Sequence, residues 1–93
     1  MMIEFDWDSA NRKHLARHRV SLEEAEEAVR DPELRFMESE EVGGEERVRM
    51  VGMTVAGRIL TVVFTFRAER IRVVTAFDAD RTAQRIYLEL KTL

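Results

Sequence analysis

The sequence predicts an α+β domain in which helices pack on one face of a mainly antiparallel β-sheet. Three successive runs of strand length, residues 46–53, 58–66 and 70–77, are rich in β-branched and aromatic side chains. Short polar or glycine-containing connectors separate them, as in a meander. Apolar residues recur at helical spacing before and after these runs. A chain of 93 residues fits one domain, residues 1–93.

The middle run is apolar on both faces, which predicts the central strand of the meander. The outer runs alternate, with Arg47 and Arg49 in one and Arg70 and Arg72 in the other opposite their apolar residues. These arginines have two interpretations that the sequence leaves about equally open. They either keep the sheet soluble and protect its edges, or they form an anion-binding face.

The N-terminal half predicts a short strand followed by two helices. Residues 3–7 alternate between apolar and acidic, as a strand beside the meander would. Asp8 is the expected N-cap of a helix over residues 9–17. Ser21 and Glu24 form a capping box that starts a second helix, which ends at Asp31-Pro32.

Residues 33–41 predict either an edge strand or an irregular return, and residues 42–45 a loop. After the meander, Asp78-Ala79-Asp80 offers N-cap candidates for a last helix. One apolar stripe then follows at helical spacing: Ala83, Ile86, Tyr87 and Leu90. The predicted order is β-α-α-(β)-β-β-β-α.

The composition excludes several classes of protein. With 45% apolar and 35% charged residues the chain is globular, and with no cysteine it has no disulfide framework. No apolar run approaches the roughly 20 residues that span a bilayer, and the N-terminus lacks the pattern of a signal peptide. We therefore expect a cytoplasmic protein that does not bind a membrane.

The charge is distributed unevenly along the chain, although the net charge is only −3. Residues 1–46 hold six basic and fourteen acidic side chains, whereas residues 47–93 hold nine and four. This asymmetry indicates that the sheet and the last helix meet an anion, or that they neutralise an acidic helix layer.

Two histidines, His14 and His18, lie four residues apart on one face of the first predicted helix. The spacing permits a metal site, but the sequence marks no third ligand. The alternatives are a structural or interfacial pair, and proton transfer.

The basic residues also permit phosphodiester chemistry on RNA. RNA supplies its own nucleophile, the 2′-hydroxyl, so a protein needs to orient it, stabilise the transition-state charge and protonate the leaving oxygen. Arginine suits the second task because its charge is fixed and its guanidinium group donates hydrogen bonds in a fork. The candidates are Arg47, Arg72, Arg81 and Arg85, with Tyr87 as a proton donor or base-stacking residue. The place of Tyr87 in the apolar stripe favours burial over either of these roles.

Several segments resemble the BrnT family of small toxins, in the same order and at similar spacing over nearly the whole chain. They are 5–8, 17–25, Val51-Gly52, 57–65, 70–76 and Tyr87. The resemblance implies a RelE-like fold and a ribonuclease toxin of a type II toxin–antitoxin pair that needs no cofactor. It also implies a BrnA-type partner, a ribbon-helix-helix antitoxin through which the complex would contact DNA. His18 lies on the family motif, so the resemblance makes it the candidate acid or base.

The sequence departs from the family pattern at a few positions. Arg19 stands where glycine is usual, Phe77-Asp78 where two basic residues are usual, and Ala83 where a glutamate is usual. The alternative hypothesis is therefore a non-catalytic relative that only binds the antitoxin. A small metal-binding domain built on the two histidines is the third.

Overall fold

The computed structural model describes residues 3–89, which form three helices and four strands in the order α-α-β-β-β-β-α. The elements are α1 (Ser9–Arg17), α2 (Leu22–Val29), β1 (Arg35–Val42), β2 (Glu45–Met53), β3 (Ile59–Arg67), β4 (Arg70–Asp78) and α3 (Arg81–Glu89). Both predicted caps are present, because Asp8 and Ser21 each close a capping box at the start of their helix.

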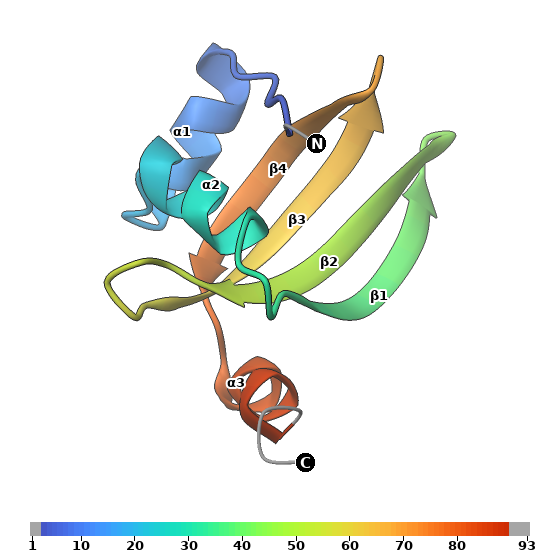
Figure 1. Cartoon of the computed structure of the whole chain (residues 1–93). Helices are drawn as coiled ribbons and strands as arrows, with labels where there is room; N and C mark the ends of the chain where they lie inside the picture. Colours follow the sequence, from blue (N-terminus) through green and yellow to red (C-terminus); the bar gives the residue numbers. More distant parts are fainter. Residues whose placement is uncertain (1–2, 90–93) are drawn as a thin grey trace.

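The four strands form one antiparallel sheet in the order β1-β2-β3-β4, so each strand pairs with its neighbour in the sequence (Figure 1). The predicted meander is confirmed as β2, β3 and β4. The segment whose fate the sequence left open is the edge strand β1. The register shifts once between β1 and β2 and once between β3 and β4, at Val63/Phe64.

The prediction of an N-terminal strand over residues 3–7 is wrong. A single parallel bridge joins Phe5 to Ile71, with the Asp6 amide donating to the Ile71 carbonyl and the Ile71 amide to that of Glu4. The pairing stops because Asn11 turns the chain into α1. Its amide group donates to the Asp6 carbonyl and its side-chain oxygen accepts from the Asp8 amide.

Helices α1 and α2 pack on one face of the sheet and enclose the larger core. Leu15 of α1 and Ala25, Ala28 and Val29 of α2 meet the buried side chains of β3 and β4 there. Helix α2 comes so close to β2 at Gly52 that a Cβ added to this glycine would lie 2.3 Å from the Ala28 carbonyl oxygen. The glycine is therefore a packing requirement.

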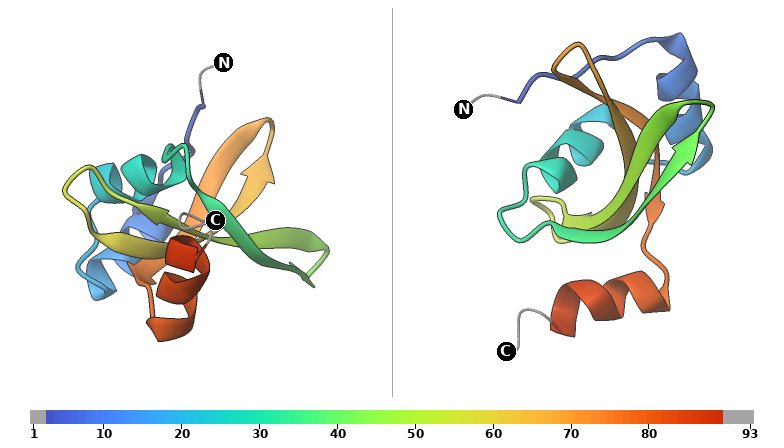
Figure 2. Two further views of the ribbon diagram at one scale, coloured as in Figure 1. Left: turned by 60° about the horizontal axis from the view of Figure 1, so that its bottom comes forward. Right: turned by 90° about the vertical axis from the view of Figure 1, so that its right-hand side faces the viewer.

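Helix α3 lies on the opposite face of the sheet, so the prediction that helices cover one face is wrong. Ala83 and Tyr87 of α3 pack against Val51, which points away from the α1–α2 face because it alternates with Met50 and Gly52. In the right-hand view of Figure 2 the sheet passes between α3 and the α1–α2 pair. The physical reason is that β2 is apolar on both faces at this end. Leu90, the last residue of the predicted stripe, lies outside the described residues.

Candidate functional site

Two of the predicted arginines converge on the face of the sheet that carries α3. Thr65 of β3 pairs with Arg72, and Phe64 pairs with Val48, so Arg47 reaches the same level of the sheet from the other side. Both guanidinium groups line a hollow of about 260 Å³ over the β4 edge, where α1 meets the sheet. The side chains that matter around it are Asn11, His14, Glu45, Arg47, Arg67 and Arg72.

Arg72 is held in place by the N-cap of α1. Its Nη1 lies 2.7 Å from Oδ2 of Asp8, and its side chain is only 15% exposed. The guanidinium, helped by the Asn11 amide, lowers the pKa of Asp8 to about 2, and Asp8 in turn raises the pKa of Arg72. The ion pair with Asp8 therefore fixes the position of the Arg72 guanidinium.

Arg47 has a less complete set of partners. Its Nε lies 3.8 Å from Oε1 of Glu45, is buried, and makes no hydrogen bond within residues 3–89. Arg67, at the end of β3, adds a third guanidinium to the same hollow. The residues that line the hollow thus include three guanidinium groups and one carboxylate, that of Glu45, and this balance favours an anion in this space.

The two histidines have different surroundings. His14 lines the hollow with the arginines. His18 is the C-cap residue of α1, and its ring lies against Phe77, 5.5 Å between centroids. Within the described residues, no group of three or more histidine, cysteine, aspartate or glutamate side chains could hold a metal ion.

The predicted residues of α3 lie at the other end of this face. Arg81 and Arg85 are exposed, and Arg85 pairs loosely with Glu89 at 3.9 Å. Tyr87 is 1% exposed and donates its hydroxyl hydrogen to Oδ2 of Asp31 at 2.5 Å. Burial, and then the Asp31 carboxylate, raise the pKa of Tyr87 above its usual value. Asp31 also accepts a hydrogen bond from the backbone amide of Met53. Met53 lies six residues, or about 20 Å, along β2 from Arg47. Tyr87 therefore anchors α3 far from the hollow.

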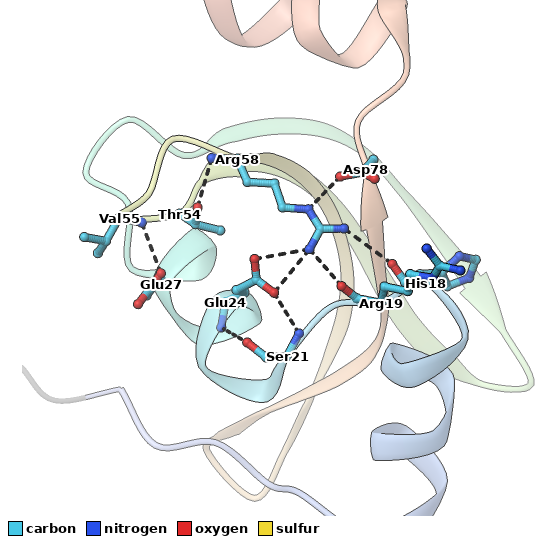
Figure 3. Close-up of polar contacts among 9 residues, drawn as sticks. All are labelled: His18, Arg19, Ser21, Glu24, Glu27, Thr54, Val55, Arg58 and Asp78. Carbon is cyan, nitrogen blue, oxygen red and sulfur yellow. Dashed lines mark hydrogen bonds and ion pairs between the residues drawn. The ribbon is translucent and has the colours of Figure 1, made fainter.

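Sequence reasoning missed a network centred on Arg58 (Figure 3). The guanidinium donates to Oδ1 of Asp78 at 2.7 Å, to both carboxylate oxygens of Glu24 at 3.1 and 3.2 Å, and to the carbonyls of Arg19 and His18 at 2.9 and 3.4 Å. It joins the α1–α2 corner to the end of β4, and Asp78 and Glu24 raise its pKa. The capping carboxylate of Glu24 was visible in the sequence, but its partner was not.

One departure from the family pattern, Arg19, lies at the corner that Arg58 holds. Arg19 has φ 55°, a left-handed conformation that glycine adopts without steric cost. The usual glycine thus suits the backbone at this position, and Arg19 takes the same conformation with its side chain exposed.

A larger hollow, of about 600 Å³, lies between α2 and the β2–β3 connection. Its walls carry carboxylates from Glu23, Glu26, Glu27, Asp31 and Glu33 against one arginine. A polyanion would be repelled there, so the smaller cationic hollow is the better candidate for a phosphate despite its size.

Within residues 3–89, no helix is long and apolar enough to span a membrane.

Comparison with protein families gives a match over residues 7–82 to the model described as the ribonuclease toxin, BrnT, of type II toxin–antitoxin systems. The chain belongs to the BrnT family. No curated protein gives a significant match. Membership makes the chain a ribonuclease toxin of a type II system and implies an RNA substrate and a cognate antitoxin. The matched range contains α1 and all four strands, and hence every residue that lines the cationic hollow of this BrnT protein.

Proposed function

We propose that this BrnT toxin cleaves RNA without a metal ion, and that Arg47 and Arg72 hold the scissile phosphate in the cationic hollow. The observation that carries the proposal is the convergence of these side chains, with Arg67, on one space of about 260 Å³. Arg72 is preorganised by its 2.7 Å ion pair with Asp8, and Arg47 lines the same hollow with a long 3.8 Å contact to Glu45. Preorganised donors stabilise a transition state better than donors that must reorganise.

The chemistry is the attack of the RNA 2′-hydroxyl on the adjacent phosphorus. Negative charge builds up on the non-bridging phosphate oxygens in the transition state, where two guanidinium groups can each donate forked hydrogen bonds. The products are a 2′,3′-cyclic phosphate and a free 5′-hydroxyl. In this proposal the protein supplies charge, orientation and proton transfer.

Arg81 and Arg85 are proposed to bind RNA phosphates that flank the cleaved one. They project from α3, which packs on the same face of the sheet as Arg47 and Arg72. Helix α3 packs against Val51, which pairs with Thr61 of β3, whereas Arg72 pairs with Thr65 of the same strand. Thr61 and Thr65 lie about 13 Å apart along this face, which is the length of a few nucleotides. We expect these two arginines to affect KM more than kcat, because they contact RNA away from the reacting atoms.

The test compares Arg47→Gln with Arg49→Gln. Both residues lie on the same face of β2, but Arg49 pairs with Glu38 at 3.6 Å and is not among the residues lining the hollow. Arg47→Gln should lower kcat/KM for RNA cleavage by about 100-fold or more, as loss of one transition-state donor does. Arg49→Gln should stay within about threefold. Equal activity of the two variants would refute the phosphate site.

We also propose that the antitoxin is a BrnA-like ribbon-helix-helix protein and that the toxin reaches DNA only through it. Family membership and the charge asymmetry of the chain support this, since a basic face accepts an acidic partner segment. Co-expression of a small ribbon-helix-helix protein encoded beside this gene should abolish growth arrest. The relation to RelE-like toxins and the cytoplasmic location stay predictions.

One set of observations favours the second candidate, a BrnT relative that binds the antitoxin without cleaving RNA. Phe77 and Asp78 replace two cations of the family pattern, Phe77 packs on His18, and Asp78 is paired with Arg58. A chain that binds the antitoxin but neither arrests growth nor cleaves RNA would support this candidate.

A further inference from the structure

We infer that Glu45 and His14 form the acid–base pair of the cleavage reaction, with Glu45 taking the proton from the 2′-hydroxyl and His14 giving one to the leaving 5′-oxygen. This inference rests on the phosphate site proposed above. The sequence pointed to His18 instead. The structure places His14 in the arginine-lined hollow and puts the ring of His18 against Phe77.

The two groups belong to different elements that meet at the hollow. Glu45 is the first residue of β2 and lies beside Arg47, while His14 lies on α1 one turn after Asn11. Asn11 is buried and its amide group is used to hold the start of α1, so it fixes the helix without facing RNA. His14 lines the hollow, and its ring makes no hydrogen bond within residues 3–89, which leaves both ring nitrogens available.

The charged groups that surround the pair come from the segment before α1 and from β2, β3 and β4. They are Asp6, Asp8, Arg47, Arg67 and Arg72. Asp8 is bound to Arg72 by its 2.7 Å contact, and the bond from Asn11 to the Asp6 carbonyl holds that residue's backbone. Glu45 is thus the carboxylate that lines the hollow itself, and His14 is the only imidazole among the residues lining it.

The assignment of roles follows from the acidities of the two side-chain types. A carboxyl group is the stronger acid, so at a given pH it is the group without its proton and the natural base. Glu45 takes the 2′-hydroxyl proton as the 2′-oxygen bonds to phosphorus. The bond from phosphorus to the 5′-oxygen then breaks, and this oxygen takes the proton of the His14 imidazolium. Exchange with water afterwards returns both groups to their starting states.

The test uses four chimeric oligonucleotides, each with a single ribonucleotide (A, C, G or U) in a DNA background, so that cleavage can occur at one bond. The parent should show a bell-shaped dependence of kcat/KM on pH. His14→Gln should remove the fall on the alkaline side, and Glu45→Gln the rise on the acidic side, each with a loss of about 100-fold or more at the optimum.

The matched controls are Lys13→Gln, an exposed neighbour on α1, and Glu46→Gln, which points to the other face of β2 and accepts from Ser39. Both should keep the bell shape. If His18→Gln removes the alkaline limb and His14→Gln keeps it, the assignment of the acid is overturned.

A second measurement separates the acid from a merely structural role. A substrate with sulfur in place of the leaving 5′-oxygen needs no proton on its leaving group. This substrate should restore most of the activity of His14→Gln and little of that of Glu45→Gln. A His14→Gln variant that is equally slow on both substrates overturns the role of His14. A parent that cleaves none of the four oligonucleotides, or an Arg47→Gln variant as active as the parent, refutes the phosphate site itself.

Discussion

Replacing Arg58 by glutamine should destabilise the fold by about 2 kcal/mol, because one guanidinium joins three separate parts of the chain. The side chain is 26% exposed, that of Glu24 31% and that of Asp78 70%. Hydrogen bonds to charged groups contribute about 1.5–3 kcal/mol when buried, and exposed ion pairs about 0.2–1 kcal/mol. We assign about 1 kcal/mol to Glu24, about 0.5 kcal/mol to Asp78 and the remainder to the two carbonyls.

The free energy of unfolding can be measured by urea denaturation, and a loss of this size should lower Tm by about 10 °C in a domain of this length. A double-mutant cycle with Glu24→Gln isolates the main pair, since glutamine can still accept the Ser21 amide bond that closes the capping box. We expect Glu24 to couple more strongly than Asp78. Although Asp78 makes the shorter contact and is the larger cause of the raised pKa of Arg58, water screens its carboxylate more.

The matched control is Arg49→Gln, which removes an exposed arginine whose ion pair with Glu38 is 3.6 Å long. This variant should change stability by less than about 0.5 kcal/mol. If Arg58→Gln is as stable as Arg49→Gln, or if its coupling to Glu24 is zero, the network does not hold the α1–α2 corner and the reasoning fails.

Four further outcomes are expected. Gly52→Ala should destabilise the fold by about 1–3 kcal/mol in urea, because the new Cβ would lie 2.3 Å from a backbone oxygen of α2; no change would show that α2 can move away. Arg19→Gly should raise the free energy of unfolding by about 0.5–1 kcal/mol, because glycine adopts the left-handed conformation without strain. Tm should rise slightly, and a lower Tm would contradict this. The pKa of Asp8 is lowered to about 2 from 3.8, so its contribution to stability is present above about pH 4 and is lost as the pH falls toward 2. Arg72→Gln should flatten this part of the stability–pH curve, and an unchanged slope would argue against the ion pair. Phe77→Arg should raise RNA cleavage if the missing cation limits the rate, and equal or lower activity would show that it does not.

The sequence alone determined the three strands of the meander and the starts of the first two helices, but not the structure of residues 3–7. The alternation in residues 46–77 predicted β2, β3 and β4 within about a residue, and the capping residues Asp8 and Ser21 predicted where both helices begin. These features depend on neighbours a few residues apart, so they can be recognised in a linear pattern. The resemblance to the BrnT family also depends on the order of such local segments, and the family comparison confirmed it.

The tertiary structure alone decided which predicted residues share a site. The sequence grouped six candidates, but the sheet register brought Arg47 and Arg72 together and left Tyr87 at the far end of the sheet. It also put α3 on the opposite face, since β2 is apolar on both sides at one end and can bury two helices. Side chains meet across strands and helix junctions according to pairing and packing between distant segments, and no spacing along the chain encodes those distances. For the same reason His14, and not His18, faces the cationic hollow.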